Sequence, residues 1–366
     1  MKIAFLADSL DFQYGGIHVY TKELLTALAE IDTKNEYLII RNKKTGEFQG
    51  CEEIAVPYPS IPGYRAWRIF FQLPKIIKKN NVDIVVEPAH FGPFNLPSKI
   101  KRITVIHDLT MFLFPEYHIF ASQFLQQKFL PRILRKADHI ITNSANTSKD
   151  LHQFFPFTKN KSTSILLGKD QIFQPFKNEN LLKRYKITVP YFLCTATLEP
   201  RKNIELLIEA FNDFKEKTAL PYQLVLIGKK GWKAEPIFKA IENSPFKKDI
   251  LLPGYVPKED LPVFYSMAEI FIYPSKYEGF GLPILEAMAC GTPIITSNIS
   301  SLPEVGGTAA EYFSPDSFSG LSQKMILLAQ NPKKQEEMGQ KSLKQAAKFT
   351  WKKTAFETIK VFENLT

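Results

Sequence analysis

The stretch Tyr191-Phe192-Leu193-Cys194-Thr195-Ala196 is an apolar run with the length of a buried strand, and a helical pattern over Ile204–Lys217 follows it. The chain opens in the same order, with an apolar run at Lys2–Ala7 before a helical pattern over Val19–Glu30. Strands that alternate with helices in this way form parallel sheets with helices on their faces. The sequence therefore predicts an α/β protein built from doubly wound, Rossmann-like sheets.

The length of the chain and the restart of this pattern predict two domains. A chain of 366 residues is longer than one hydrophobic core usually supports. The alternation begins again near Tyr191, after the loop Gly168–Pro175. We expect a first domain over 1–168 and a second over 169–349, facing a central cleft at the carboxyl ends of their strands, where such sheets bind ligands. Strands are expected at Lys2–Ala7, Tyr37–Ile40, Val82–Val86, Ile103–Ile106, His139–Thr142, Tyr191–Ala196, Gln223–Ile227, Ile250–Leu252, Ile270–Tyr273 and Thr292–Thr296, and helices at Val19–Glu30, Tyr64–Asn80, Phe120–Ala137, Ile204–Lys217, Lys258–Met267, Pro283–Ala289 and Ser317–Gln330.

The composition indicates a globular protein with an anionic partner. The formal charge of +10 favours nucleic acid, an anionic membrane or phosphorylated ligands. No signature of a nucleic-acid module occurs, so nucleic acid is not an expected partner. No apolar run of about 18 residues and no cleavable signal is found, which favours a cytoplasmic protein. Cys51, Cys194 and Cys290 are too few and too scattered for a disulfide framework or a thiolate metal site.

The segment Glu278-Gly279-Phe280-Gly281-Leu282-Pro283-Ile284-Leu285-Glu286 places two carboxylates on either side of a Gly-Phe-Gly turn. The glycines let the backbone approach a ligand, and Pro283 suits the first turn of a helix whose free N–H groups favour an anion. Carboxylates beside an anion site are suited to accepting hydrogen bonds from sugar or ribose hydroxyls. On spacing alone, an ordinary alternative stays open, in which Glu286 is a solvated first-turn glutamate and Glu278 a surface loop residue.

Two other turns follow expected strands. Glu199-Pro200-Arg201-Lys202-Asn203 precedes the helix that begins at Ile204, and its two cations are suited to neutralising a diphosphate. Gly15-Gly16-Ile17 follows the first strand, where backbone N–H groups can meet a phosphate. The alternatives are a solvated basic turn and a tight strand-to-helix turn. The missing third glycine disfavours a nicotinamide enzyme.

His107 and Asp108 close the expected strand Ile103–Ile106 and so lie at the carboxyl edge of the first sheet. A histidine there either exchanges a proton near neutral pH or serves as a structural hydrogen-bonding residue. No cluster of His, Cys and carboxylates has the spacing of metal ligands, and no Gly-x-Ser-x-Gly or phosphate-loop motif occurs. We expect no metal site.

Residues 64–79, Tyr-Arg-Ala-Trp-Arg-Ile-Phe-Phe-Gln-Leu-Pro-Lys-Ile-Ile-Lys-Lys, mix bulky apolar and basic side chains. A helix of this kind either packs on the core with a solvated basic side, which we favour, or lies on an anionic membrane surface. Pro74 interrupts any long continuous helix.

With these residues the chain resembles the retaining glycosyltransferases of family 4, which have the GT-B fold. The resemblance covers nearly the whole chain, and its most specific part is Glu278–Gly291. The matching segments are Gly15-Gly16-Ile17, His107-Asp108, Ala137-Asp138 through Asn143-Ser144, Glu199 to Asn203, Leu252 to Val256, Tyr273-Pro274-Ser275 and Glu278 to Gly291. Two departures are the absence of a basic residue between the strand ending at Ala196 and Arg201, and His18 where arginine or glycine is common.

The resemblance implies a role for each matching site residue. Glu286 would hold the ribose hydroxyls, and Lys202 with Arg201 would bind the diphosphate. His107 would touch the transferred hexose near the reacting centre. The sugar and phosphates of the donor would contact Glu278 with Gly279, Phe280, Gly281 and Leu282. The diphosphate would also contact Gly15 and Gly16. The base would contact Gly254, Tyr255 and Val256. Members need no metal, and the helix after Phe349–Ala355, at about 350–366, packs back on the first domain.

These expectations combine into a retaining, metal-independent hexosyltransferase. By resemblance to the mannosyltransferase-type members, GDP-mannose is favoured over UDP-glucose as the nucleoside diphosphate sugar. The acceptor is expected to be a hydroxyl of a glycan or lipid-linked molecule in cell-surface polysaccharide synthesis. Glu278 is the candidate nucleophile for double displacement, but family precedent favours same-face attack. Peripheral contact with the inner face of an anionic membrane is a further expectation. The alternatives are a nucleotide-sugar epimerase or phosphorylase on the same fold, and a non-catalytic basic adaptor.

Overall fold

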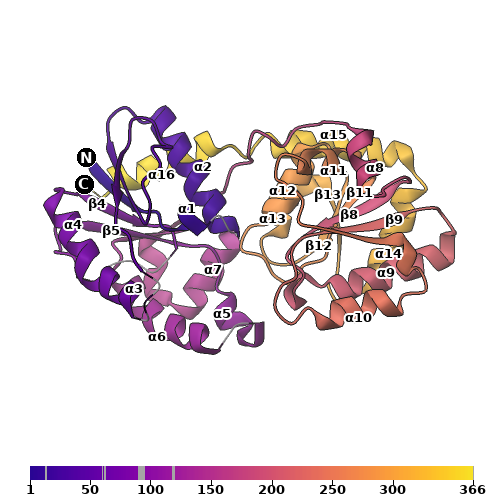
Figure 1. Cartoon of the computed structure of the whole chain (residues 1–366), viewed down its shortest axis with the longest axis horizontal. Helices are drawn as coiled ribbons and strands as arrows, with labels where there is room; N and C mark the ends of the chain where they lie inside the picture. The colour runs from indigo at the N-terminus through magenta and orange to yellow at the C-terminus, as the bar shows by residue number, and fades with distance from the viewer. Residues whose placement is uncertain (13–14, 60, 62, 90–94, 118–119, 366) are drawn as a thin grey trace. The chain divides into compact units, whose positions relative to one another are not determined.

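The computed structural model describes residues 1–12, 15–59, 61, 63–89, 95–117 and 120–365. The chain divides into two compact units (Figure 1). Unit 1 contains Met1–Gly168 together with the segment that begins at Thr350, and unit 2 contains Lys169–Phe349. Among the described residues, no helix combines the length and the apolar character that crossing a bilayer requires.

Unit 1 is built on a seven-stranded parallel sheet in the order β3-β2-β1-β4-β5-β6-β7. The order reverses beside β1, as expected for a doubly wound sheet. The central strands β1, β4 and β5 bury most of their residues because helices cover both faces of the sheet. The strands are β1 (Lys2–Leu6), β2 (Glu36–Arg41), β3 (Glu52–Ala55), β4 (Ile84–Glu87), β5 (Lys101–Ile106), β6 (His139–Thr142) and β7 (Ser162–Ser164).

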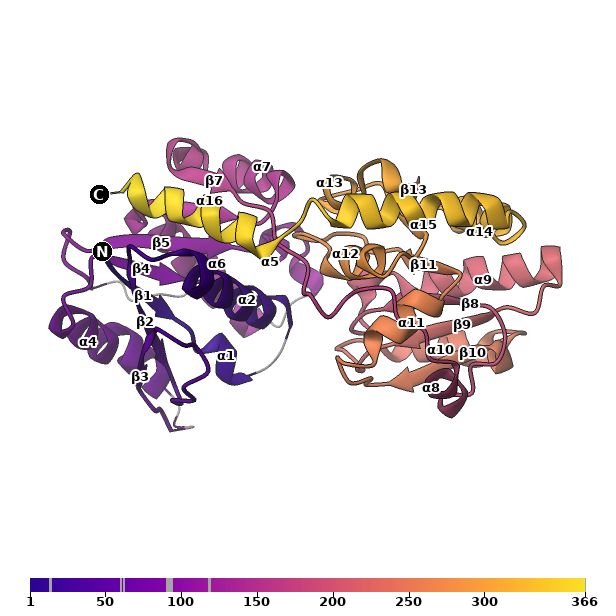
Figure 2. The ribbon, with the colours of Figure 1, turned by 90° about the horizontal axis from the view of Figure 1, so that it is seen from above.

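The helices of unit 1 cover the two faces of this sheet. Helix α2 packs against the C-terminal helix α16, whose Phe362 meets Phe5 of β1 (Figure 2). The C-terminal helix thus returns to unit 1, as the sequence predicts. The helices are α1 (Ser9–Phe12), α2 (Gly15–Ile31), α3 (Tyr64–Trp67), α4 (Leu73–Lys79), α5 (Thr110–Leu113), α6 (Phe120–Lys136), α7 (Ala145–Phe154) and α16 (Trp351–Glu363).

The segment expected to be one helix over Tyr64–Asn80 has three parts. A π-helical turn over Arg68–Gln72 separates α3 from α4, just before Pro74. Pro74 has no N–H to donate to the carbonyl of Phe70, and the side chain of Asn95 donates to that carbonyl instead, at 3.2 Å. The expected solvated basic side is wrong for Arg68, which is only 1% exposed.

Unit 2 contains a six-stranded parallel sheet in the order β10-β9-β8-β11-β12-β13, the same winding as in unit 1. Its core includes Phe192, Phe211 and Phe214, whose rings pack between β8 and α9. The strands are β8 (Tyr191–Thr195), β9 (Gln223–Ile227), β10 (Ile250–Gly254), β11 (Ile270–Tyr273), β12 (Ile294–Ser297) and β13 (Ala310–Phe313). The helices are α8 (Glu179–Arg184), α9 (Ile204–Thr218), α10 (Glu235–Asn243), α11 (Leu261–Met267), α12 (Leu282–Ala289), α13 (Leu302–Gly306), α14 (Phe318–Ala329) and α15 (Pro332–Ala346).

Every expected strand is found, with ends that shift by a few residues. The sequence missed β3, β7 and β13. It also placed the start of α11 too early, at Lys258, because that side chain belongs to the preceding turn and forms an ion pair with Asp170.

Candidate active site

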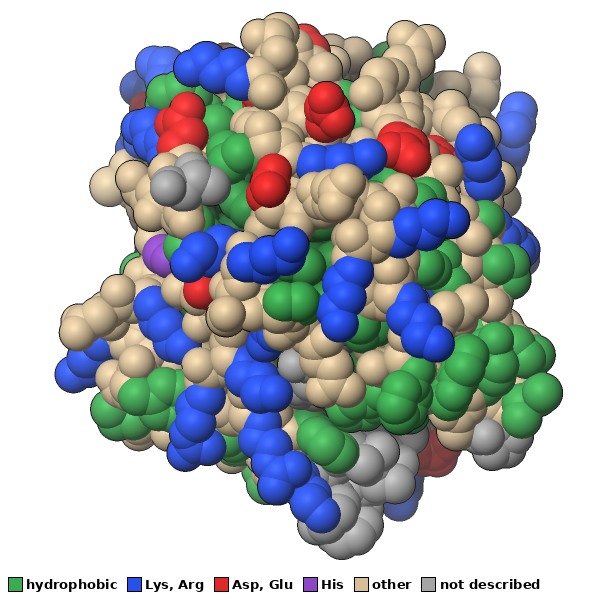
Figure 3. Space-filling model, turned by 90° about the vertical axis from the view of Figure 1, so that its left-hand side faces the viewer, with side chains coloured by type: hydrophobic (Ala, Val, Ile, Leu, Met, Phe, Trp, Pro, Cys, Tyr) green, Lys and Arg blue, Asp and Glu red, His purple; other side chains and the backbone are tan. Residues whose placement is uncertain are grey.

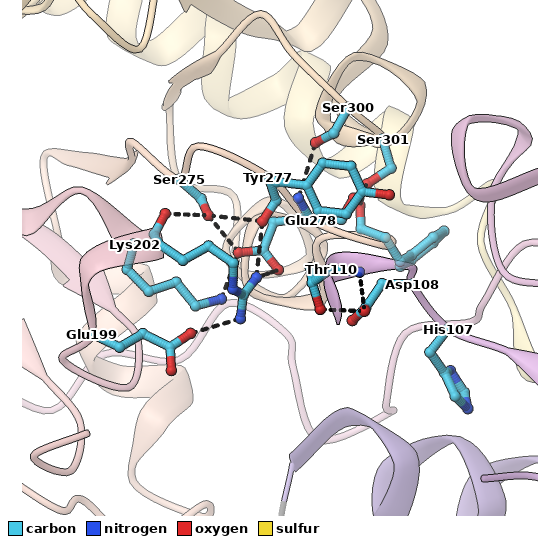
Figure 4. A network of polar contacts seen from close by, with 12 residues as sticks. His107, Asp108, Thr110, Glu199, Lys202, Ser275, Tyr277, Glu278, Ser300 and Ser301 are labelled. Atoms are coloured by element: carbon cyan, nitrogen blue, oxygen red, sulfur yellow. Dashed lines mark hydrogen bonds and ion pairs between the residues drawn. The ribbon is translucent and has the colours of Figure 1, made fainter. Parts of the chain in front are cut away.

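A cluster of charged side chains lies where β8 and β11 of unit 2 end (Figure 4). The Nζ atom of Lys202 is 2.5 Å from Oε1 of Glu278, and Nη1 of Arg201 is 3.2 Å from Oε2 of the same carboxylate. Nη2 of Arg201 also contacts Oε1 of Glu199, at 2.7 Å. The sequence motifs that carried two cations and a carboxylate therefore meet in space, although 76 positions separate Lys202 from Glu278.

Glu278 is a buried, fully engaged carboxylate. Besides the two cations, its Oε1 accepts hydrogen bonds from Ser275 Oγ at 2.6 Å and from Tyr273 Oη at 3.0 Å. Burial alone would raise the pKa of Glu278, but Lys202 and Arg201 outweigh that effect and lower the pKa to about 2. The surface-loop alternative for Glu278 is wrong, because the residue is only 9% exposed.

The turn that carries the two cations is fixed by Asn203. This residue adopts a left-handed conformation at φ 58°, which asparagine tolerates better than most residues. Its side-chain amide donates to the carbonyls of Pro274 at 3.2 Å and Pro315 at 2.8 Å. The turn is thereby tied to the loop after β11, which holds Lys202 beside Glu278.

Hydrogen bonds to two serines, Ser300 and Ser301, hold the Gly-Phe-Gly turn in place. Ser300 Oγ accepts a hydrogen bond from the backbone N–H of Glu278 at 3.0 Å. Ser301 Oγ contacts the carbonyls of Glu278 at 2.9 Å and Phe280 at 2.8 Å. The side chain of Phe280 is buried against Phe349, so Phe280 offers a ligand only its backbone. Gly281, at φ 108°, forms the N-cap of α12.

Glu286 lies on α12 and is partly accessible. Tyr265 Oη donates to its Oε2 at 2.9 Å, and Tyr265 in turn contacts Thr195 Oγ1 at 2.7 Å. Burial raises the pKa of Glu286 to about 7, with the hydrogen bond from Tyr265 opposing that effect. The two glutamates of the motif therefore differ in charge state near neutral pH, although the sequence presents them as a pair.

The expected base site lies at the end of β10. Gly254 has φ 77° and no neighbour that a Cβ atom would meet. The ring of Tyr255 is 66% exposed, and Lys229 Nζ lies 4.8 Å from its centroid. The side chain of Val256 is buried, at 3% exposure.

In unit 1, His107 directly follows β5, as predicted. Its Nε2 lies 2.8 Å from the carbonyl oxygen of Pro88, which can only accept, so Nε2 carries a proton. Tyr20 packs edge-on against the imidazole ring with centroids 5.0 Å apart. Asp108 accepts hydrogen bonds from the N–H and hydroxyl of Thr110, which is a local turn contact. The contacts with Pro88 and Tyr20 orient the imidazole, whereas the bonds of Asp108 hold the turn that follows β5.

Gly15 and Gly16 begin α2, and both are exposed. Their place at a helix start, with φ 72° at Gly15, agrees with the turn expected from the sequence. His18 directs Nδ1 to the carbonyl of Ser9 at 3.2 Å, which is a structural contact. Within the described part of the chain, no group of three or more His, Cys, Asp or Glu side chains is placed to hold a metal ion.

Sequence reasoning missed several supporting residues. Tyr273 and Ser275 lie in a segment that matched the family pattern, which was a usable signal. Tyr265, Ser300 and Ser301 had no such signal, because they act through contacts made across the fold.

Comparison with known proteins shows the family to which the chain belongs. The family described as "Glycosyltransferase Family 4" matches residues 14–170, and "Glycosyl transferases group 1" matches residues 177–345. O-antigen chain mannosyltransferase B of Escherichia coli is 35% identical over 282 residues, which covers 75% of this chain and 74% of that protein. This chain is a family 4 glycosyltransferase.

Other relatives of this glycosyltransferase fit the same assignment. O-antigen chain mannosyltransferase RfbU of Salmonella typhimurium is 25% identical and covers 82% of this chain, with 83% of its own length matched. Sucrose-phosphate synthase from Thermosynechococcus elongatus has a TM-score of 0.79 at 19% identity, over 100% of this chain and 99% of that chain. Anabaena HepE, solved in complex with UDP and glucose, has a TM-score of 0.77 at 15% identity, with both chains covered in full. These two structures show that the fold is GT-B.

Proposed function

We propose that this glycosyltransferase moves a mannosyl group from GDP-mannose to a hydroxyl of a glycan or lipid-linked acceptor in polysaccharide synthesis. The transfer would proceed with retention at the anomeric carbon and without a metal. Support for the sugar and the pathway comes from the relatives, two of which are named O-antigen chain mannosyltransferases. Support for the chemistry comes from the residues of unit 2.

The observation that carries the proposal is the Lys202–Arg201–Glu278 cluster beside the start of α12. Breaking the bond to the sugar adds a negative charge to a diphosphate that already carries one on each phosphate, and this added charge needs stabilisation as the bond breaks. In the free protein, Glu278 and Glu199 hold the two cations in place. A buried cation without such a partner would be costly, so the carboxylates keep the cations ordered until the diphosphate arrives.

The contacts of Glu278 favour a positioning role. Both of its oxygens are engaged by side chains of unit 2, and its low pKa makes it a weak base. A nucleophilic carboxylate would have to give up these partners to attack the sugar. Same-face attack needs no protein nucleophile, because the acceptor hydroxyl attacks the anomeric carbon directly while the departing phosphate takes up its proton.

The exposed Tyr255 ring with Lys229 beside it supports a guanine base. An aromatic face stacks on any base, whereas a lysine donates well to the O6 and N7 acceptors of guanine. Adenine presents an amino group where guanine presents O6, so the same lysine would favour it less.

The test is a thermal-shift screen of GDP-, UDP- and ADP-sugars, followed by transfer assays on Lys202→Met. GDP-mannose should raise the melting temperature of the wild type most, since a ligand stabilises the folded state by mass action. Lys202→Met should lose at least about a hundredfold in kcat/KM, because one charge contact to a developing anion contributes roughly 3 kcal/mol.

Lys239→Met is the matched control, because Lys239 is exposed on α10, away from the cluster. Near-normal transfer by Lys202→Met would overturn the proposal. Epimerised or hydrolysed donor in the absence of any acceptor would support an epimerase or a phosphorylase instead.

A further inference from the structure

An aromatic group on the surface of unit 1 has no role in the core. Trp67 is 49% exposed and Phe71 is 55% exposed, and their ring centroids lie 6.4 Å apart. The ring of Tyr64 lies tilted against that of Trp67 with centroids 5.3 Å apart, and Ile61, three residues before Tyr64, is 60% exposed. Residues 67 and 71 lie on the side of the segment opposite Ile69, Leu73 and Ile77, which fill the core. Bulky side chains rarely gather on a surface without a partner.

The orientation of this group is fixed by a buried ion pair. Arg68 directs Nη1 to Asp8 at 2.5 Å, and its Nε donates to the carbonyl of Val56 at 3.1 Å. Arg68 thereby anchors the segment to the core of unit 1, while Trp67 and Phe71 stay exposed. The packing of this segment on the core therefore determines that the aromatic side chains are exposed.

Exposed cations continue along the same segment and along α6. Lys75, Lys78 and Lys79 are exposed on α4, and Arg132, Arg135 and Lys136 are exposed on α6. Neither residues 64–79 nor residues 120–136 contain an Asp or a Glu. We call these six cations, together with Trp67 and Phe71, the basic-aromatic face.

Both helices cover the same face of the sheet. Val85 of β4 packs with α4 and pairs with Arg102 of β5. Ile140 of β6 packs with α6 and pairs with Thr104, two residues further along β5. Residues two apart in a strand point to the same side. Figure 3 shows the side of unit 1 where β1 begins, with Lys and Arg side chains over its middle and lower parts and a hydrophobic group beside them.

We propose that the basic-aromatic face docks unit 1 on a bilayer that contains anionic lipids. Trp67 and Phe71 would enter the interfacial layer, where amphipathic aromatic rings are favoured. The six cations would lie against the anionic head groups, and their long aliphatic stems suit that depth. A bilayer fits better than a nucleic acid, because Ile61 and Phe71 extend the apolar area with side chains that have no hydrogen-bonding group.

The test is co-flotation of the full chain with vesicles of phosphatidylcholine alone and with vesicles in which a third of the lipid is phosphatidylglycerol. The wild type should bind the vesicles that contain phosphatidylglycerol and should not bind the neutral vesicles. Its binding should weaken at high salt. Lys75→Glu/Lys78→Glu/Lys79→Glu should weaken binding at least about tenfold. Trp67→Ser/Phe71→Ser should also weaken it, although that variant keeps every charge.

The matched control is Lys239→Glu/Lys333→Glu/Lys341→Glu, which makes the same change of net charge at exposed positions of unit 2. It should bind as the wild type does. Equal losses in the two triple variants would overturn the proposal, as would equal binding to neutral vesicles. Tight binding of the wild type to single-stranded RNA, abolished by Trp67→Ser/Phe71→Ser, together with no flotation would assign the face to a nucleic acid. Because flotation requires no donor, its outcome is independent of the proposed transfer reaction.

Discussion

Glu286 combines a hydrogen bond from Tyr265 with a pKa raised by burial to about 7, so its charge changes within the working range of an enzyme. If its carboxylate accepts hydrogen bonds from the donor's ribose, only the charged form binds well. The KM for GDP-mannose should then fall roughly tenfold from pH 6 to pH 8, which is the change in the charged fraction of a group with that pKa. Glu286→Gln should bind weakly at both pH values. Steady-state kinetics at the two pH values would measure this change.

The stability of the protein supplies an independent check on Glu286. A carboxyl whose pKa is raised in the folded state disfavours folding once it is charged, so stability falls as pH rises from about 4.5 to 7. Glu286→Gln should therefore be more stable than the wild type at pH 8 and similar to it at pH 4. Glu336→Gln, at an exposed position on α15, is the control for the loss of one carboxylate. In the kinetic test, equal KM values of the wild type for GDP-mannose at pH 6 and pH 8 would contradict the ribose role of Glu286.

The candidate site residues could be named from the sequence, but their charge states could not. Lys202, Glu278 and Glu286 were identified from residue type and local spacing. The ion pair between Lys202 and Glu278 joins residues 76 positions apart, and no local pattern encodes it. The division into a fully charged Glu278 and a Glu286 that titrates near pH 7 likewise depends on burial and on neighbours from other elements.

At the scale of an element, the start of α12 depends on a glycine. Gly281 has φ 108°, and an added Cβ would lie 2.9 Å from Cδ2 of Leu302. Gly281→Ala should lower the stability of the protein by about 2 kcal/mol, from backbone strain and this overlap together. It should also lower kcat/KM, because the Gly-Phe-Gly turn would move with it. Thermal unfolding followed by circular dichroism, with transfer assays, would measure both effects.

Two variants separate the causes of this effect. Gly50→Ala imposes a similar strain at φ 78° but meets no neighbouring atom, so it should cost less. Adding Leu302→Val to Gly281→Ala removes the atom that overlaps, so the double variant should lose less stability than the two single losses summed. Wild-type stability and activity in Gly281→Ala would show that the turn tolerates a side chain.

The strands that sequence analysis missed share a physical cause. Strands β3, β7 and β13 lie at the edges of their sheets and are only partly buried, so they lack the apolar run that marks a central strand. Helix α15 is largely polar and buries small or polar residues such as Ser342 and Gly339. Buried central strands such as β9 and β11 were located to the residue, because burial on both faces forces a continuous apolar run.

At the scale of the whole molecule, the two units differ in how the chain builds them. Unit 2 is one continuous segment, Lys169–Phe349, with its own sheet and core. Unit 1 needs the C-terminal helix α16, whose Ala355, Thr358 and Phe362 are buried. The chain segments at the two ends of unit 2 also pack closely where they enter unit 1. A Cβ on Gly168 would lie 2.2 Å from the backbone nitrogen of Trp351. Removing α16 would therefore expose part of the core of unit 1.

This asymmetry predicts the behaviour of fragments. The fragment 169–349 should fold alone and bind GDP-mannose within about tenfold of the full chain, because Lys202, Glu278, Glu286 and Tyr255 all belong to it, and a tenfold loss is only about 1.4 kcal/mol. It should transfer no sugar, since His107 is absent. The fragment 1–168 should be poorly soluble, and joining 350–366 to it by a flexible linker should restore a cooperative unfolding transition. Circular dichroism and calorimetric titration would measure folding and binding. A folded 169–349 that fails to bind the donor, beside a full chain that binds it, would mean that unit 1 supplies most of the nucleotide affinity.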